Sequence, residues 1–285
     1  VATRKTAKAA GAAEGVNTLA SYLKSDVDLN IPVSKVKQEK TFAVIIANEN
    51  YQEEVNVEFA LNDGMAFREY CVKLLGIPES NLHVRKDATL NNMLAEINWM
   101  QNIAKAYGAE ARFIFYYAGH GMPDESNGTS YLLPVDGKSN ILATGYSMSR
   151  LYAELNGLNA ACVTVLMDAC FSGSKRGEGM LASARGVALK AKAEAPKGNM
   201  LVMTAAQGSE TAYPYKEKKH GLFTYFLLKK LQESKGKVTY GDLFDYVKMN
   251  VAQKSVVVNE KSQTPTIAVS GDLVSTWQGI RLNED

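Results

Sequence analysis

The chain has 285 residues, of which 46% are hydrophobic and 22% are charged, and its formal net charge is +2. This length and apolar content suffice for a sizeable core, in one large domain or two small ones. The near-neutral charge gives no reason to expect binding to nucleic acid or to a membrane surface, and no apolar run is long enough to span a bilayer.

Residues 1–39 form a compositional zone of their own, which starts rich in alanine, lysine and glycine with almost no large apolar residue. We interpret this zone as an N-terminal arm, linker or pro-segment packed on a domain at 40–285; a disordered leader is the alternative. The chain starts at Val1 rather than methionine and shows no signal peptide, so a removed leader and the compartment are left open.

From residue 41 onward, short apolar runs alternate with longer amphipathic stretches, and the runs have the β-branched and aromatic composition of buried strands. Strands are expected at 41–47, 82–85, 111–117, 162–167, 199–204 and 266–269. Apolar residues at helical spacing predict helices at 59–75, 89–107, 221–233 and 239–252. This alternation predicts an α/β fold with about six mostly parallel strands and helices on both faces of the sheet.

Two glycine-containing loops follow two of the predicted strands directly. One reads Ala-Gly-His120-Gly, and the other reads Asp168-Ala-Cys170-Phe-Ser-Gly. Ligands of parallel sheets bind at the carboxyl ends of the strands. If the two strands are neighbours, His120 and Cys170 emerge at the same edge of the sheet.

This pair of residues can carry out nucleophilic catalysis. The thiolate of Cys170 would attack a carbonyl carbon, and His120 would take the thiol proton and later protonate the leaving amine. The backbone N–H groups of Gly121 and Cys170 are the candidate donors to the oxyanion, because glycine allows close approach of the backbone. The pattern therefore predicts a cysteine-dependent hydrolase.

Other cysteines and histidines are assigned to packing or to the surface. Cys71 lies within a predicted helix and Cys162 begins a predicted strand, where cysteine is ordinarily inert. The odd, sparse cysteine count argues against a disulfide framework, and the lack of a Cys-x-x-Cys pair argues against a zinc site. We interpret His83 as a surface residue. His220, which precedes a predicted helix, is the second candidate for the catalytic base.

The two loops resemble the catalytic motifs of the caspase-like clan of cysteine peptidases, with the histidine about fifty residues before the cysteine. The resemblance spans roughly residues 40–269. Caspases carry Gln-Ala-Cys-x-Gly at the nucleophile, whereas 168–173 resembles the Asp-x-Cys-x-Ser-Gly motif of metacaspases and their bacterial relatives. The stretch Leu-Asn-Asp63-Gly likewise resembles the Asn-Asp that metacaspases carry after the first strand.

The resemblance implies an endopeptidase that acts on peptide or protein substrates. In metacaspases, the residues matching Asp63 and Asp168 line the pocket for the residue before the scissile bond. Two carboxylates there favour Arg or Lys and repel acidic residues, so we expect cleavage after a basic residue. The alternative is that Asp63 caps or solvates a helix and Asp168 orients its loop.

One departure and one open question concern the resemblance. Ala118 stands where metacaspases commonly have serine before Gly-His-Gly, so a polar pocket contact is missing. We expect no cofactor and no metal site, but many metacaspases need calcium. The acids Asp124, Glu125 and Asp136 follow the histidine loop without forming a convincing site, so calcium activation stays open.

The connection 174–198 is basic and rich in small residues, which predicts self-cleavage there by a basic-specific enzyme; an ordinary solvated loop is the alternative. Arg4, Lys5 and Lys8 raise the hypothesis that the arm mimics substrate and keeps the enzyme latent, as a zymogen. Two rival classes remain: a catalytically silent caspase-like scaffold and a redox protein. The intact Cys170–His120 pair disfavours the scaffold, and the lack of a resolving cysteine disfavours the redox protein.

Overall fold

The computed structural model describes residues 24–124, 129–171, 196–208 and 210–283. Its main sheet has six strands in the order β11-β8-β7-β3-β1-β2. Their bounds are β1 Thr41–Ala47, β2 Leu82–Lys86, β3 Arg112–Ala118, β7 Cys162–Asp168, β8 Met200–Thr204 and β11 Thr266–Val269. Five strands are parallel and β11 pairs antiparallel with β8. The predicted sheet is therefore confirmed.

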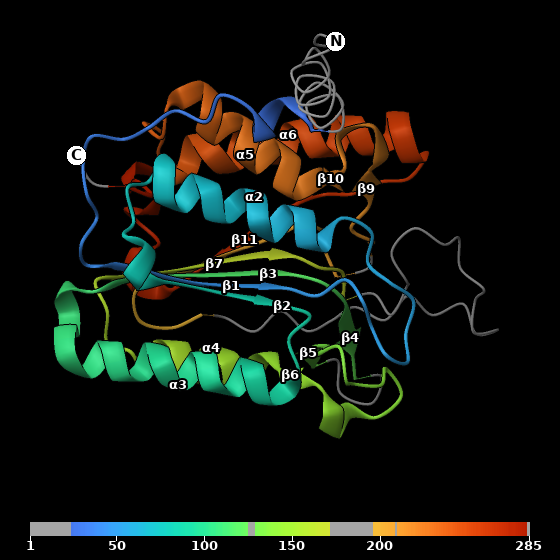
Figure 1. The fold of residues 1–285 in the computed structure, drawn as a ribbon, viewed down its shortest axis with the longest axis horizontal. Coiled ribbons are helices and arrows are strands. Elements are labelled where there is room, and N and C mark those ends of the chain that lie inside the picture. Colours follow the sequence, from blue (N-terminus) through green and yellow to red (C-terminus); the bar gives the residue numbers. More distant parts are fainter. Residues whose placement is uncertain (1–23, 125–128, 172–195, 209, 284–285) are drawn as a thin grey trace, which may run out of the picture.

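Helices cover both faces of this sheet, as predicted (Figure 1). One face carries α2 (Ala60–Lys73), α5 (Leu222–Ser234) and α6 (Tyr240–Asn259), and the other carries α3 (Leu90–Tyr107) and α4 (Met148–Asn156). Helix α6 begins after Thr239, whose side chain accepts a hydrogen bond from the Asp242 N–H group at 3.2 Å. It ends at Asn259, about two turns beyond the predicted end at 252.

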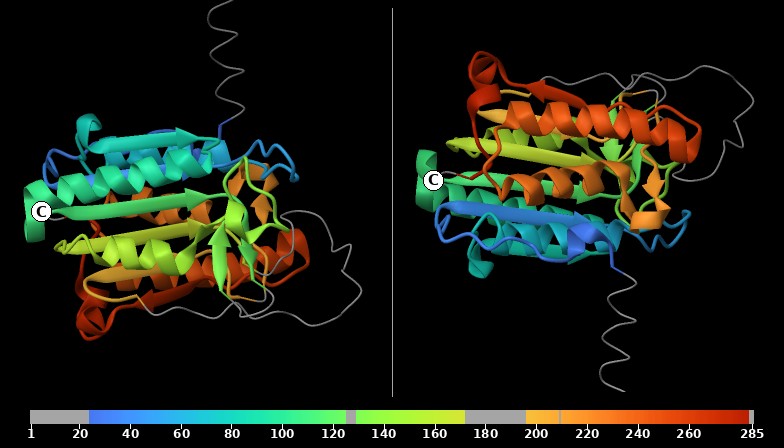
Figure 2. Two further views of the ribbon diagram at one scale, coloured as in Figure 1. Left: turned by 90° about the horizontal axis from the view of Figure 1, so that it is seen from below. Right: turned by 90° about the horizontal axis from the view of Figure 1, so that it is seen from above.

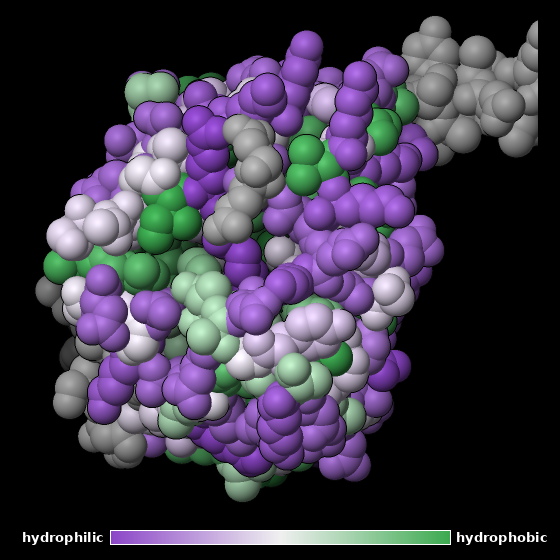
Figure 3. All heavy atoms as spheres, turned by 90° about the vertical axis from the view of Figure 1, so that its left-hand side faces the viewer, coloured by the Kyte–Doolittle hydropathy of each residue, from purple (hydrophilic) through white to green (hydrophobic). Residues whose placement is uncertain are grey.

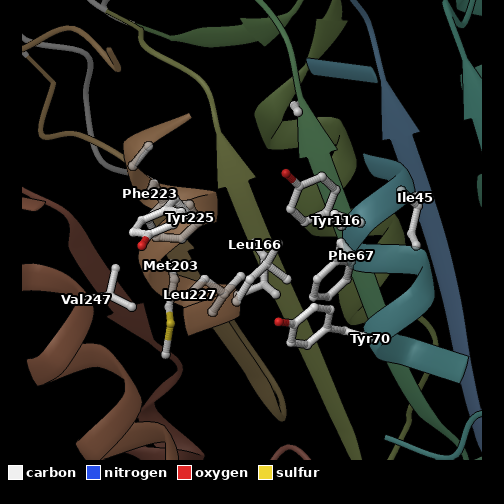
Figure 4. Packing of buried hydrophobic residues seen from close by; sticks show 14 of the residues in the cluster. Ile45, Phe67, Tyr70, Tyr116, Leu166, Met203, Phe223, Tyr225, Leu227 and Val247 are labelled. Carbon is white, nitrogen blue, oxygen red and sulfur yellow. The ribbon is translucent and has the colours of Figure 1, made fainter. Parts of the chain in front are cut away.

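Each face of the sheet has its own apolar core. Side chains of a strand alternate between faces, so Ile45 and Tyr116 pack in the cluster under α2, α5 and α6, whereas Val44 and Phe115 pack in the other cluster. Figure 4 shows the first cluster, where Phe67 of α2 stacks on Tyr116 with ring centroids 4.6 Å apart. Burial on both faces explains why the strands read as uninterrupted apolar runs.

The carboxyl ends of the parallel strands lie together, on the right in Figure 1. Two small sheets flank this end (Figure 2): β4 (Gly121–Pro123), β5 (Ser130–Leu132) and β6 (Tyr146–Ser147) form one, and β9 (Pro214–Tyr215) and β10 (His220–Gly221) form the other. The opposite end of the molecule is largely hydrophilic with interspersed apolar residues (Figure 3). Among the described helices, none combines the length and hydropathy that a membrane crossing requires.

Candidate active site

The register of the sheet brings the histidine and cysteine loops to one edge. Strands β3 and β7 are parallel neighbours in which Ala118 pairs with Asp168. His120 and Cys170 each lie two residues beyond this pair, and the Gly119 N–H group donates to the Asp168 carbonyl oxygen at 3.3 Å. The two loops predicted to meet are therefore hydrogen-bonded to each other.

Gly121 shows how closely these loops approach. A Cβ atom on Gly121 would lie 2.6 Å from the Cys170 carbonyl oxygen and 2.5 Å from a ring carbon of Phe171. Real Cβ atoms do not come that near to backbone oxygen, so glycine is required at this position. The Leu133 N–H group donates to the His120 carbonyl oxygen. Hydrogen-bonded and non-hydrogen-bonded pairs alternate along an antiparallel ladder, so the next pair, Gly121 with Leu132, is not hydrogen-bonded. The N–H group of Gly121 therefore points away from β5.

The imidazole of His120 has a defined tautomer. Its Nε2 atom lies 2.7 Å from the carbonyl oxygen of Val55. A carbonyl oxygen can only accept, so Nε2 carries a proton, and in the neutral ring Nδ1 holds the lone pair. Nδ1 is therefore the ring nitrogen that can accept a proton. Val55 was not anticipated from the sequence, because it lies on the loop between β1 and α2, far from both motifs.

Two buried tyrosines hold the His120 backbone. The His120 N–H group donates to the Tyr51 hydroxyl oxygen at 2.8 Å, and the Tyr51 hydroxyl donates to the Leu133 carbonyl oxygen at 3.2 Å. The Tyr117 hydroxyl donates to the His120 carbonyl oxygen at 2.7 Å. Burial raises the pKa of both tyrosines, so both stay protonated and able to donate. Only Tyr117, next to the motif, carried a sequence signal.

The loop after β1 is fixed in turn by Asn48. Its side-chain oxygen accepts from the Ala88 N–H group at 2.8 Å, and its amide nitrogen donates to the Leu133 carbonyl oxygen at 3.2 Å. Its own N–H group donates to the Ala118 carbonyl oxygen. Asn48 thereby links the ends of three strands at the edge that holds His120. A polar residue directly after a buried strand was the available signal.

We expect Tyr51→Phe to lower the free energy of unfolding by about 1–3 kcal/mol, because a buried N–H group of His120 loses its acceptor. Denaturant-induced unfolding followed by circular dichroism measures this change. Tyr107→Phe is the control, since Tyr107 is exposed at the end of α3 and its substitution should leave stability unaltered. Equal stabilities of the two variants would contradict the role assigned to the Tyr51 hydroxyl.

Asp63 and Asp168 meet at the N-terminus of α5. The Asp63 carboxylate accepts from the Gly221 N–H group at 3.0 Å. The Asp168 carboxylate accepts from the N–H group of Thr224 at 3.2 Å and from its hydroxyl at 2.7 Å. Both carboxylates are fully buried and lie where the helix end is electropositive. The structure thus brings the two predicted residues together, in an arrangement that fits helix capping as well as substrate binding.

His220 lies between two carboxylates. Its Nδ1 atom is 2.8 Å from Asp63 Oδ1, and its Nε2 atom is 3.3 Å from Asp28 Oδ1. Burial lowers the pKa of His220, but the bonds to Asp28 and Asp63 outweigh it and raise the pKa to about 9. The ring is therefore an imidazolium at neutral pH, with no nitrogen lone pair. The alternative in which His220 serves as the base does not fit this geometry.

The remaining candidate residues have other bonding partners or lie outside the described residues. The Asp136 carboxylate accepts from the Leu90 N–H group at 3.0 Å, at the start of α3. Within 24–124, 129–171, 196–208 and 210–283, no group of three or more His, Cys, Asp or Glu could hold a metal ion. Glu125, the substrate-mimic residues Arg4, Lys5 and Lys8, and all but the last residues of 174–198 lie outside the described residues.

The fold is of the cysteine-protease type. The family model described as "Caspase domain" matches residues 40–272, and the chain belongs to this family.

Two solved structures with the same fold are the protein GSU0716 from Geobacter sulfurreducens and caspase-1 from Spodoptera frugiperda. The first is 18% identical with a TM-score of 0.61, and the match covers 85% of this chain and 98% of the other. The second is 14% identical with a TM-score of 0.58, covering 85% of this chain and 92% of the other. A search of the curated proteins found no match.

Proposed function

We propose that the protein is a cysteine endopeptidase in which Cys170 is the nucleophile and His120 its base. The observation that carries this proposal is the register of β3 and β7. Ala118 is paired with Asp168, and His120 and Cys170 each lie two residues beyond this pair. The Val55 carbonyl oxygen supports it by fixing the tautomer of His120, because the lone pair of Nδ1 can then receive the thiol proton.

The proposed reaction follows from these contacts. The thiol proton passes to His120 Nδ1 as the sulfur of Cys170 bonds to the scissile carbonyl carbon. The N–H groups of Gly121 and Cys170 stabilise the negative oxygen of the tetrahedral intermediate. The imidazolium then protonates the leaving amine as the C–N bond breaks. Water, deprotonated by His120, hydrolyses the thioester and returns the sulfur with its proton.

The proposed substrates have Arg or Lys before the scissile bond. Two carboxylates lie beside the α5 N-terminus, those of Asp63 and Asp168, against the single imidazolium of His220. This excess of negative charge favours a cationic side chain. Because Asp63 and Asp168 are buried, the basic group of the substrate has to approach them at this helix end.

We expect an irreversible peptidyl electrophile ending in Arg to label Cys170 at least about 100-fold faster than the same peptide ending in Asp, because a carboxylate would meet like charges without compensation. Intact-protein and peptide mass spectrometry give the rate and the labelled residue. Preference for the Asp probe would contradict the basic specificity. No labelling by either probe, with the protein folded, would favour the silent scaffold.

Two further properties belong to this proposal. Self-cleavage within the basic connection 174–198 would appear as two fragments that Cys170→Ala does not produce. Calcium activation is tested by running the labelling reaction with calcium and with a chelator, where equal rates would support the expectation that no metal is needed.

A further inference from the structure

Residues 25–29, ahead of the matched domain, dock on α5 and α2. This N-terminal segment contains the single 3₁₀ turn η1 (Asp26–Asp28), dark blue in Figures 1 and 2. Val27 is fully buried in the core cluster beneath α5, and its carbonyl oxygen accepts from the Tyr70 hydroxyl of α2 at 2.8 Å. The segment is therefore part of the packed structure and holds its polar side chains in defined places.

Asp26 and Asp28 have different partners although they lie two residues apart. The Asp26 carboxylate forms ion pairs with Lys218 at 2.8 Å and Lys229 at 2.9 Å. The Asp28 carboxylate faces His220, and one of its oxygens also accepts from the Ser25 N–H group at 2.9 Å. Of these two carboxylates, only that of Asp28 contacts His220.

The positive charge that faces Asp63 belongs to a side chain of the protein itself, that of His220. His220 is fully buried, and each of its ring nitrogens lies within hydrogen-bond distance of a carboxylate. Both nitrogens can donate only when the ring is doubly protonated. A carboxylate proposed to receive a substrate guanidinium is thus already paired with a positive charge.

We propose that His220 is a specificity-determining residue: its imidazolium occupies Asp63 as an internal counter-cation with which the basic side chain of the substrate competes, and Asp28 of the N-terminal segment holds that cation in place. This inference rests on the proposed cleavage after basic residues. It assigns a role in substrate selection to a segment that precedes the caspase domain.

Protonation of His220 should weaken the binding of a basic substrate side chain at Asp63. When His220 is an imidazolium, it screens Asp63 from a second cation. When His220 loses its proton, Asp63 keeps its negative charge without that screen, and an Arg side chain binds better. The pKa of His220 is raised to about 9 by Asp28 and Asp63 against the effect of burial. The screen is therefore complete at neutral pH and is lost as the pH rises through about 9.

Other charged and titratable groups lie around Asp28 and His220, and their bonding partners differ from those of His220. They are Lys24 and Asp26 of the N-terminal segment, Tyr70 of α2, Lys218 before β10, and Tyr225 and Lys229 of α5. Asp26 and its two lysines form their own pairs, so they supply a matched control on the same segment.

The test compares two electrophilic peptides that end in Arg or in citrulline, which has the same shape without the charge. At pH 7.5 we expect the Arg/citrulline ratio of Cys170 labelling rates to rise about three- to tenfold in Asp28→Asn and in His220→Gln, because the competing cation is weakened or removed. In the wild-type protein the ratio rises only as the pH passes about 9. Asp26→Asn should change the ratio by less than about twofold, because Asp26 does not contact His220.

Each outcome of this test bears on the inference. A purely structural role of Asp28 or His220 would slow both probes equally and leave the ratio constant, which would overturn the inference, as would a ratio that falls. Thermal unfolding of each variant identifies one that does not fold, and Asp28→Asn, whose side chain is partly exposed, then serves as the informative variant. If the wild-type protein is not labelled by the Arg probe at all, the proposed function fails rather than the role of His220.

Discussion

Cys170→Ala is expected to lower kcat/KM for hydrolysis of an Arg-ending fluorogenic peptide by at least about 10⁴-fold, because loss of the nucleophile removes the covalent route altogether. Fluorophore release at several substrate concentrations measures this loss. Circular dichroism should show an unaltered fold, since the change removes one sulfur atom from the edge of the sheet. Retained turnover by this variant would end the assignment of Cys170.

Cys162→Ala is the matched control for this experiment. Cys162 and Cys170 are each 4% exposed, but Cys162 starts β7 whereas Cys170 follows its end. The strand separates them by about 20 Å. Removing the sulfur of Cys162 should therefore leave kcat/KM within about threefold of the wild-type value, because it lies far from the reacting atoms. An equal loss in both variants would indicate a structural effect of cysteine removal rather than catalysis.

His120→Ala is expected to lower kcat by about 10²–10⁴-fold, the usual contribution of a general acid–base group. The alkylation rate of Cys170 by iodoacetamide at neutral pH should fall as well, because a cysteine without a nearby base is mostly thiol there. These two measurements together separate activation of the sulfur from protonation of the leaving amine. An undiminished alkylation rate with reduced kcat would assign His120 to the second step only.

His83→Gln is the control for the histidine change. His83 lies on the edge strand β2, where its Nδ1 atom is 2.6 Å from Glu96 and its ring stacks on Trp99. Glutamine can keep a hydrogen bond to Glu96, so we expect full activity from this variant. A loss of activity comparable to that of His120→Ala would show that the assay responds to general destabilisation.

Most of the fold follows from local patterns in the sequence. The strands β1 and β11 begin and end as predicted, β2, β7 and β8 differ from the prediction by one residue at one end, and β3 differs by one residue at both ends. Such runs are readable because strands buried on both faces are continuously apolar. Helix α4 was missed although Met148, Leu151 and Leu155 repeat at helical spacing, because nine residues give few turns in which to detect the period. The strands of the small sheets have only two or three residues and no period at all.

The site was predictable only in part. The histidine and cysteine loops could be located because each follows a readable strand and carries glycine. The contacts that orient them come from residues distant in sequence, such as Val55 and Tyr51 for His120. No local sequence pattern identifies which backbone carbonyl group will accept such a hydrogen bond. The contact of Asp28 with His220 joins positions 192 residues apart, and only the packing of the N-terminal segment on α5 reveals it.

The aligned register of β3 and β7 has a consequence for how such chains can vary in length. Insertions in the loops between β4 and β7 would leave the ends of β3 and β7 aligned, so the number of residues between His120 and Cys170 can vary without changing the edge that they share. One residue added between Ala118 and His120 would instead turn the imidazole to the opposite side of its loop, because neighbouring side chains point in opposite directions. Relatives should therefore differ in the lengths of the loops between the motifs and agree in the two residues that follow each strand.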